Sequence, residues 1–307
     1  MPNRSIATDP RPSGPPTVKT LAERVMVRET RVAFGPVAKS LSGDPLRPAS
    51  WQVLGDEFLL RGEGDHYFHY RLGEGITIER GHDADLSEEA LWLNGTVYAA
   101  IASLNGLLPI HASAVALEEH VFAFTGPAGA GKSTLVAALG DRGLPMFCDD
   151  TLVLDLSDPD RIICLPGHKR MKLTPGALQL TGATREKQVS RTVDKCYASP
   201  QAGDVGVALP LARLIFLEVG ERPEITPITG SERFVRMQDD HQTAHLFAAA
   251  RQFDRAGSFA HLSRLARQIV MARFARPHDV GRFAAGVAMV EQYITEVATE
   301  WDQEQQP

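Results

Sequence analysis

The sequence predicts an α/β protein with a phosphate-binding loop in its core. From residue 108 onward, apolar runs typical of buried strands alternate with helical segments, which is the pattern of a layered α/β core. One run, at 121–125, leads into a glycine-rich loop and then a helical segment at 133–141. A long amphipathic segment closes the chain. We expect four parts: a disordered tail at 1–20, a small β-rich region at 21–83, a P-loop core at 84–277, and a C-terminal helix and tail at 278–307.

Composition narrows the class of protein. The chain has 307 residues, of which 43% are hydrophobic and 23% charged, so it can bury a large core as one domain or two small ones. The net charge of −6 argues against a surface that is basic throughout, and we expect no nucleic-acid partner. Three cysteines without a CxxC pair indicate neither a disulfide framework nor a zinc site. These features favour a cytoplasmic protein.

We expect neither a secretory signal nor a membrane span. The first sixteen residues hold five prolines and no apolar core, which argues against a secretory signal and for disorder. The stretch from Ala90 to Leu117 has no formal charge, but Asn94, Asn105 and Pro109 interrupt it. We interpret it as a buried helix followed by a buried strand, and expect no membrane partner.

The β-rich region is predicted from short runs bounded by turns. Residues 51–54, 57–60, 67–70 and 76–78 are β-branched or aromatic, and Gly or Asp residues separate them. Residues 20–50 carry no clear pattern. A helix should follow, beginning near Asp85 or Ser87, where Asp85 and Glu88 have the spacing of a capping box, and ending near Asn105-Gly106.

The core and the closing helix follow from apolar periodicity. Strands are predicted at 121–125, 152–156, 162–165, 214–219 and 269–275, with a further helix at about 258–268. From Val280 to Trp301, apolar residues recur at alternating spacings of three and four, after a possible cap at Asp279. This helix either packs on the core or forms a seam between copies, so a homo-oligomer is possible.

The glycine-rich loop matches the full P-loop (Walker A) pattern. Its glycines let backbone N–H groups close around phosphate oxygens, the lysine supplies a cation to the β- and γ-phosphates, and the serine hydroxyl suits Mg²⁺. The following helix directs its positive end at the anion. The predicted nucleotide-binding residues are Gly126, Pro127, Ala128, Gly129, Ala130, Gly131, Lys132, Ser133 and Thr134.

Two adjacent acids and one histidine complete the candidate site. Asp149 and Asp150 follow a short apolar run after the loop helix. Neighbouring side chains on an extended chain point in opposite directions, so one acid can face Mg²⁺ and the other a different part of the site. That suits phosphoryl transfer to an alcohol. His111, just ahead of the P-loop strand, could orient or tune a catalytic carboxylate, although a lone histidine in an apolar run is usually a core residue.

Together, His111-Ala-Ser-Ala-Val115, the P-loop and the acidic pair resemble the HPr kinase/phosphorylase family. The resemblance implies a P-loop core of the type shared with ATP-dependent phosphoenolpyruvate carboxykinase, and ATP-dependent phosphorylation of a serine hydroxyl. It implies that Lys132 and Ser133 hold ATP and Mg²⁺, that Asp149 is the general base with His111 beside it, and that Asp150 is the metal ligand. The two aspartates could exchange these roles.

The resemblance extends from near residue 84 to 277. With the upstream β-rich region, the chain is similar to stand-alone HPr kinase-like proteins of peptide-modification clusters, including the kinases of lasso-peptide biosynthesis. The segment after the acidic pair also resembles theirs, and makes Lys169, Arg170 and Lys172 candidates for contacting phosphate or an acidic peptide. As bare sequence, such a basic cluster is more often a solvated face.

The departures from the family narrow the function. The Glu-Ile-Arg-Gly-type signature that bifunctional HPr kinase/phosphorylases carry does not follow the acidic pair. This argues against phosphorolysis and against HPr as the acceptor. The sequence therefore predicts a serine kinase acting on a small protein or a ribosomally made precursor peptide. A small-molecule enzyme of the carboxykinase type and a non-catalytic nucleotide-sensing protein are the alternatives.

Overall fold

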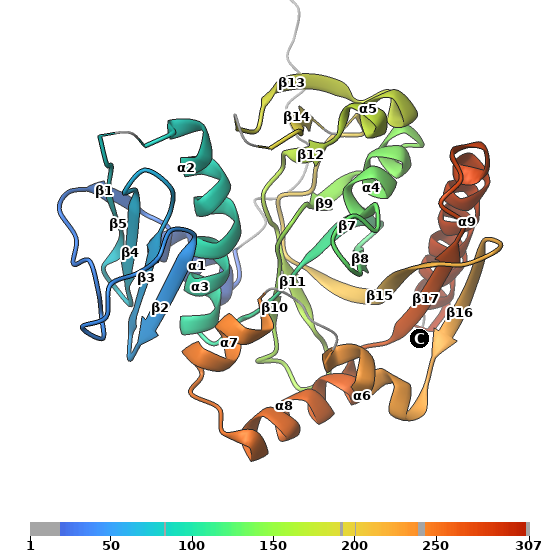
Figure 1. Ribbon diagram of the computed structural model, residues 1–307. Coiled ribbons are helices and arrows are strands. Elements are labelled where there is room, and N and C mark those ends of the chain that lie inside the picture. The colour runs from blue at the N-terminus through green and yellow to red at the C-terminus, as the bar shows by residue number, and fades with distance from the viewer. Residues whose placement is uncertain (1–18, 83, 191–192, 200, 239–242, 305–307) are drawn as a thin grey trace, which may run out of the picture.

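The computed structural model describes residues 19–82, 84–190, 193–199, 201–238 and 243–304, and it is a mixed α/β protein (Figure 1). Most of the predicted disordered tail, residues 1–18, lies outside the described residues. Among the helices described, none is both long and apolar enough to span a bilayer. All three cysteines are buried free thiols.

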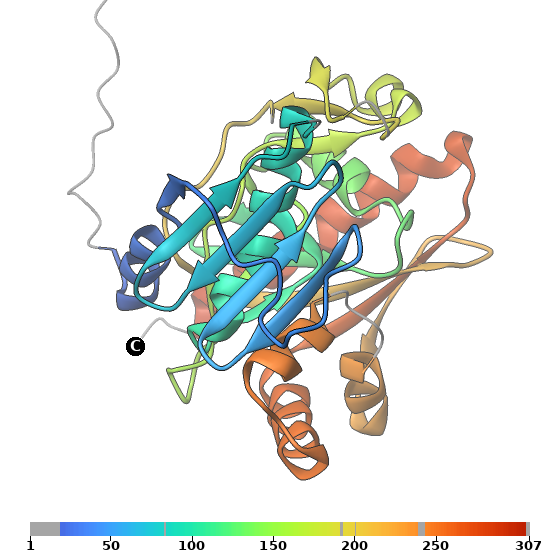
Figure 2. The ribbon, with the colours of Figure 1, turned by 60° about the vertical axis from the view of Figure 1, so that its left-hand side comes forward.

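The N-terminal region is a sheet packed on a helical stretch (Figure 2). Within the described residues it has five strands in the order β1-β5-β4-β3-β2, comprising β1 (Val32–Phe34), β2 (Ser50–Leu54), β3 (Glu57–Arg61), β4 (Tyr67–Arg71) and β5 (Gly75–Glu79). The four predicted runs are strands β2 to β5 and pair antiparallel, whereas β1 pairs with β5 in parallel. Helix α1 (Leu21–Glu29) precedes them, and a capping box between Thr20 and Glu23 begins it.

The helix predicted at 85–105 is present but has a π-helical turn in its middle. It comprises α2 (Leu86–Trp92), the π-helical turn η1 (Leu93–Val97) and α3 (Tyr98–Leu104). The Asp85 carboxylate accepts from the Ser87 N–H at its start, and Gly106 ends it with φ 81°. One face of α3 packs on the N-terminal sheet, and the cluster it belongs to also includes Val153 and Leu165 of the core. Burial from two sides explains why α3 carries no charged residue.

The core is one twisted, mixed sheet. In the described part of the chain its main order is β6-β10-β11-β15-β8-β7-β9, and β17 pairs with both β15 and β16. The strands are β6 (Leu108–Ile110), β7 (Ala112–Leu117), β8 (His120–Thr125), β9 (Met146–Cys148), β10 (Leu152–Asp155), β11 (Ile163–Leu165), β15 (Leu209–Val219), β16 (Glu224–Ile228) and β17 (Met271–Arg276). Strand β15 runs parallel to β8 and β17, so the ends of all three lie at one edge of the sheet.

Helices cover both faces of this sheet. Along β8, Phe122 and Phe124 face the cluster of α4 (Lys132–Asp141) and α9 (Val280–Glu304), whereas Val121 and Ala123 face the opposite cluster. The opposite face is covered by α6 (Gly230–Gln238), α7 (Ala244–Ala250) and α8 (Arg255–Gln268). The buried apolar positions of α9 between Val287 and Ala298 pack on the core, as expected of a terminal helix that packs on it, whereas Val280 at its start is exposed.

A small sheet lies beside the P-loop helix. It contains β12 (Met171–Leu173), β14 (Cys196–Ser199) and β13 (Thr184–Gln188), paired in that order. Helix α5 (Pro175–Thr181) follows β12 and contacts α4. In Figure 1 this unit closes the top of the core, next to α4.

A buried polar network fastens α3 to the N-terminal sheet. The Tyr70 hydroxyl donates to Glu29 at 2.8 Å and accepts from the Asn105 amide at 2.8 Å. The Glu29 carboxylate is fully buried and also accepts from the Gly73 N–H at 2.8 Å. The network therefore joins α1, β4 and the end of α3 through hydrogen bonds that are buried or partly buried.

We expect Tyr70→Phe to destabilise the protein, because it leaves the Glu29 carboxylate and the Asn105 amide each short of one partner. The free energy of unfolding should fall by about 1–3 kcal/mol, measured by urea titration. Tyr293→Phe, on α9 and outside this network, is the control and should change stability little. An unchanged unfolding midpoint for Tyr70→Phe would show that the network contributes nothing.

Candidate functional site

The P-loop joins the end of β8 to the start of α4. Gly126 and Gly131 adopt φ of 142° and 86°, a region that disfavours side chains. A Cβ atom would lie 2.9 Å from the Leu217 carbonyl oxygen at Gly126, and 2.5 Å from the Arg276 guanidinium at Gly131. Gly126 is therefore required by space as well as by conformation, whereas Gly131 is required by its conformation and a side chain there would displace the Arg276 guanidinium. The first N–H groups of α4 open onto the loop and suit an anion.

Lys132 holds its cation at the loop. Its ammonium donates to the carbonyl oxygens of Gly126 at 2.9 Å and Pro127 at 3.3 Å. Burial lowers the pKa of Lys132, and the nearby carboxylates of Asp149 and Asp150 oppose that shift. The cation thus lies among the carbonyls of the loop that would receive the phosphates.

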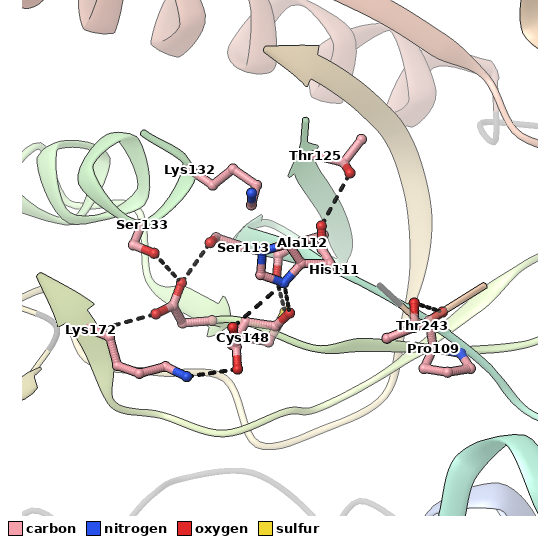
Figure 3. A network of polar contacts seen from close by, with 12 residues as sticks. Pro109, His111, Ala112, Ser113, Thr125, Lys132, Ser133, Cys148, Lys172 and Thr243 are labelled. Carbon is pink, nitrogen blue, oxygen red and sulfur yellow. Dashed lines mark hydrogen bonds and ion pairs between the residues drawn. The ribbon is translucent and has the colours of Figure 1, made fainter. Parts of the chain in front are cut away.

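Asp149 accepts hydrogen bonds from three different elements (Figure 3). Its Oδ1 accepts from the Ser113 hydroxyl at 2.6 Å and the Ser133 hydroxyl at 2.7 Å, and its Oδ2 accepts from the Lys172 N–H at 3.1 Å. The side chain is only 1% exposed. The carboxylate therefore lies directly beside the P-loop hydroxyl that suits Mg²⁺.

The Asp150 side chain points in a different direction from that of Asp149, because the chain turns sharply between them. It has a φ of 76°, and the Thr151 N–H donates to the Asp149 carbonyl at 3.0 Å, which closes a γ-turn around it. Its Oδ2 lies 2.7 Å from the Lys172 ammonium, and its Oδ1 lies 3.5 Å from His111 Nδ1. The two carboxylates diverge as expected, but a turn separates them, and not the alternation of an extended chain.

The charge of Asp150 is supported by its neighbours. Burial is the largest effect and raises the pKa of its carboxyl, but the charge and hydrogen bond of Lys172, together with His111 and Lys195, lower the pKa by more. The pKa of Asp150 consequently lies below its ordinary value. The group is an ion-paired carboxylate at neutral pH.

His111 is held by the backbone of Asp150. Its Nδ1 lies 2.8 Å from the Asp150 carbonyl oxygen, which can only accept, so Nδ1 carries the proton and Nε2 is an acceptor in the neutral ring. Burial lowers the pKa of His111, and the Lys132 cation lowers it further. The imidazole is therefore neutral near pH 7, beside a charged carboxylate.

Of the three basic residues predicted to contact substrate, the structure brings Lys172 to the site. The Lys169 ammonium instead donates to the carbonyl oxygens of Phe147 and Val205 in the interior, so the structure does not bring this residue to the site. Arg170 is exposed and lies 3.5 Å from Glu186 on β13, away from the aspartates. Both residues precede β12, and Lys172 faces the site between the buried Met171 and Leu173.

A cavity of about 310 Å³ joins these groups. It is lined by six P-loop residues, both aspartates, His111 and Ser113, together with Lys172, Thr174 and Lys195; the six are Ala128, Gly129, Gly131, Lys132, Ser133 and Thr134. This volume lies at the lower end of the range for small-ligand sites. It places the predicted nucleotide-binding loop and the acidic pair in one space.

The oxygen donors fit Mg²⁺. Among the described residues, no group of three or more His, Cys, Asp or Glu side chains could form an all-protein metal site. Mg²⁺ does not require one, because it is usually bound through one or two carboxylates, water and substrate phosphates. The Ser133 hydroxyl and the Asp149 carboxylate, 2.7 Å apart, are hard oxygen donors of this kind.

Two further residues support the site. Ser113 alternates along β7 with Ala112 and Ala114, which face the α6–α8 layer, so its hydroxyl faces α4 and reaches Asp149. Arg276, at the end of β17, donates to the Ala130 carbonyl at 2.9 Å, and burial lowers its pKa. Strand alternation could have indicated Ser113, and the shared edge of parallel strands could have indicated Arg276.

Comparison with known proteins does not assign a family. No protein-family model matches the chain, and no curated protein matches it. Among solved structures, it is similar to the Hpr(Ser) kinase/phosphatase from Coxiella burnetii, with a TM-score of 0.36 and 15% sequence identity over 64% of this chain and 93% of that one. A likeness at this level is too low to identify the family or the activity.

We expect Arg276→Ala to weaken ATP binding, because Arg276 holds the P-loop through Ala130. The dissociation constant should rise about tenfold or more, as expected for a lost hydrogen bond from a charged donor. Calorimetric titration with ATP and Mg²⁺ measures it. Arg282→Ala, an exposed arginine on α9, should bind ATP as the wild type does. Equal affinity in the two variants would exclude this role for Arg276.

Proposed function

We propose that the chain is an ATP- and Mg²⁺-dependent phosphotransferase that moves the γ-phosphoryl group to a hydroxyl. This proposal rests on the observation that the two adjacent aspartates contact different groups. Asp149 hydrogen-bonds the P-loop hydroxyl of Ser133, whereas Asp150 turns toward His111 and Lys172 at the edge of the same cavity. A nucleotide sensor needs the first arrangement but has no use for the second.

The hydrogen bonds favour an exchange of the roles expected from the resemblance. Asp149, expected as the base, has both oxygens occupied by donors and lies against Ser133. Asp150, expected as the metal ligand, contacts Lys172 and His111 instead. We therefore assign Mg²⁺ to Ser133 and Asp149, and the acceptor hydroxyl to Asp150. When bound, Mg²⁺ would neutralise charge on the phosphate oxygens.

The proposed transfer is one displacement at the γ-phosphorus. The acceptor oxygen forms a bond to the γ-phosphorus while the bond from that phosphorus to the bridging oxygen breaks, and ADP leaves. The hydroxyl proton passes to the Asp150 carboxylate. Lys132 faces the developing negative charge on the phosphates, and Lys172 with His111 keeps the Asp150 carboxylate in place.

The acceptor we propose is a serine of a small protein or a ribosomally made precursor peptide. This follows from the resemblance of the motifs, and the carboxykinase alternative gains no support from the cavity. A dicarboxylate substrate would require arginines beside the acidic pair, whereas the positive side chains among the described residues that line this cavity are Lys132, Lys172 and Lys195.

We expect Asp149→Asn and Asp150→Asn to fail in different ways. Asp149→Asn should lose the Mg²⁺ dependence of ATP binding, because the carboxylate beside Ser133 is gone. Asp150→Asn should bind Mg²⁺ and ATP normally but transfer phosphate about 100-fold more slowly or worse, as for a lost general base. Asp155→Asn, at the half-buried end of β10, is the matched control.

The assay supplies labelled ATP and Mg²⁺ with HPr and, separately, with precursor peptides encoded beside the gene, and detects added phosphate by intact mass. Phosphate on a peptide serine, absent with Asp150→Asn, would support both the reaction and its acceptor. Full transfer by Asp150→Asn would overturn the assignment of the base. ATP binding without transfer to any hydroxyl would favour the nucleotide-sensing alternative.

A further inference from the structure

We propose that a second cavity beside Asp150 binds an uncharged, apolar group next to the acceptor hydroxyl; this inference rests on the proposed phosphotransfer. The cavity has a volume of about 370 Å³ and lies between the N-terminal region and the core. It shares Leu91, His111, Asp150 and Lys172 with the nucleotide cavity. An acceptor held there would reach Asp150 from the side opposite the P-loop.

The cavity's apolar walls come mainly from the N-terminal region. Trp51 extends from β2, Trp92 ends α2, and buried side chains of β3, α3 and α7 complete the apolar surface, namely Leu60, Ala99 and Leu246. Both indoles are only partly buried. Partly exposed indoles beside a reaction site offer a large apolar contact area with little loss of conformational freedom.

The π-helical turn brings backbone, and no side chain, up to the acid. Gly95 lies in this turn, and a Cβ atom built there would be 3.5 Å from Asp150 Oδ2. That is ordinary contact distance, so alanine would fit, but a longer side chain would occupy the space in front of the carboxylate. A π-turn is unusual and is often found at functional sites. Here it gives an acceptor room beside Asp150.

The charged side chains that line this cavity indicate which class of chemical group it would bind. Among the described residues that line this cavity, the formally charged ones are Asp150 and Lys172, and they pair with each other at 2.7 Å. The remaining polar side chains are His111 and the threonines Thr96, Thr151 and Thr243. A charged substituent would lose its hydration without gaining a partner. The group that fits is apolar, either a side chain flanking a serine or the body of a small alcohol.

The first test blocks the cavity. We expect Gly95→Leu to lower kcat/KM for the acceptor at least about tenfold, because an apolar pocket contact of this kind is worth about 10- to 200-fold. The affinity for ATP should not change, and this also reports that the variant is folded. Gly176→Leu is the matched control, since Gly176 is exposed on α5 and has no atom within 4 Å of a Cβ built there.

The second test varies the acceptor. Blocked pentapeptides Gly-Gly-Ser-X-Gly and Gly-X-Ser-Gly-Gly, with X as Leu, Phe, Asp or Lys, form the peptide arm, and benzyl alcohol against glycerol forms the small-alcohol arm. Phosphate transfer should favour the apolar member of a pair about tenfold or more. Preference confined to the peptides assigns the group to a flanking side chain, and preference confined to benzyl alcohol assigns it to a small alcohol.

A binding measurement separates this pocket from the kinase activity. In a Trp301→Phe background, Trp51 and Trp92 are the remaining tryptophans of the three. Titration with the Phe-containing peptides and with benzyl alcohol should give a saturable fluorescence change that Gly95→Leu abolishes. Such a change without any phosphate transfer would refute the kinase and retain the pocket. Transfer with equal rates for all acceptors, or full turnover by Gly95→Leu, would refute the pocket and retain the kinase.

Discussion

The buried carboxylate of Asp149 is the interaction on which the site depends. A carboxylate in the protein interior is stable only when hydrogen bonds replace its water, and each bond to a charged group contributes about 1.5–3 kcal/mol. Its three donors lie on α4, β7 and β12. The P-loop helix, the central sheet and the small sheet must therefore be correctly placed relative to one another to supply them. The same carboxylate therefore assembles the three walls of the nucleotide cavity.

The turn at Asp150 uses strain to separate two neighbouring acids. A non-glycine residue with positive φ costs on the order of 1–3 kcal/mol, and the surrounding structure must hold it. Lys172 and His111 do so, through an ion pair at 2.7 Å and a hydrogen bond to the Asp150 carbonyl at 2.8 Å. Strand β12 is central to both acids, because the Lys172 N–H binds Asp149 and its ammonium binds Asp150. One residue thereby fixes the spacing between the two carboxylates.

Local sequence signals predicted the elements, and long-range contacts decided their details. The P-loop strand and helix, the four N-terminal strands and the closing helix all follow from spacing and turn residues within short windows. The π-turn at Leu93–Val97 has no comparable signal in the local sequence. The prediction likewise could not separate Lys169 from Lys172, since the carbonyls that capture Lys169 belong to Phe147 and Val205, far along the chain. The roles of the two aspartates depended on a backbone turn that an extended-strand argument does not contain.

The burial of α3 also bears on whether the site is formed before substrate arrives. Its apolar residues pack at once against the N-terminal sheet and against Val153, Leu165 and Leu246 of the core. Moving this helix away would expose apolar surface on both sides, at about 25 cal/mol for each Å². The Glu29–Tyr70–Asn105 network, at the far end of α3 from the π-turn, adds buried hydrogen bonds to that cost. The wall that carries Trp92 and Gly95 continues directly from this buried helix, so α3 anchors it at one end beside Asp150.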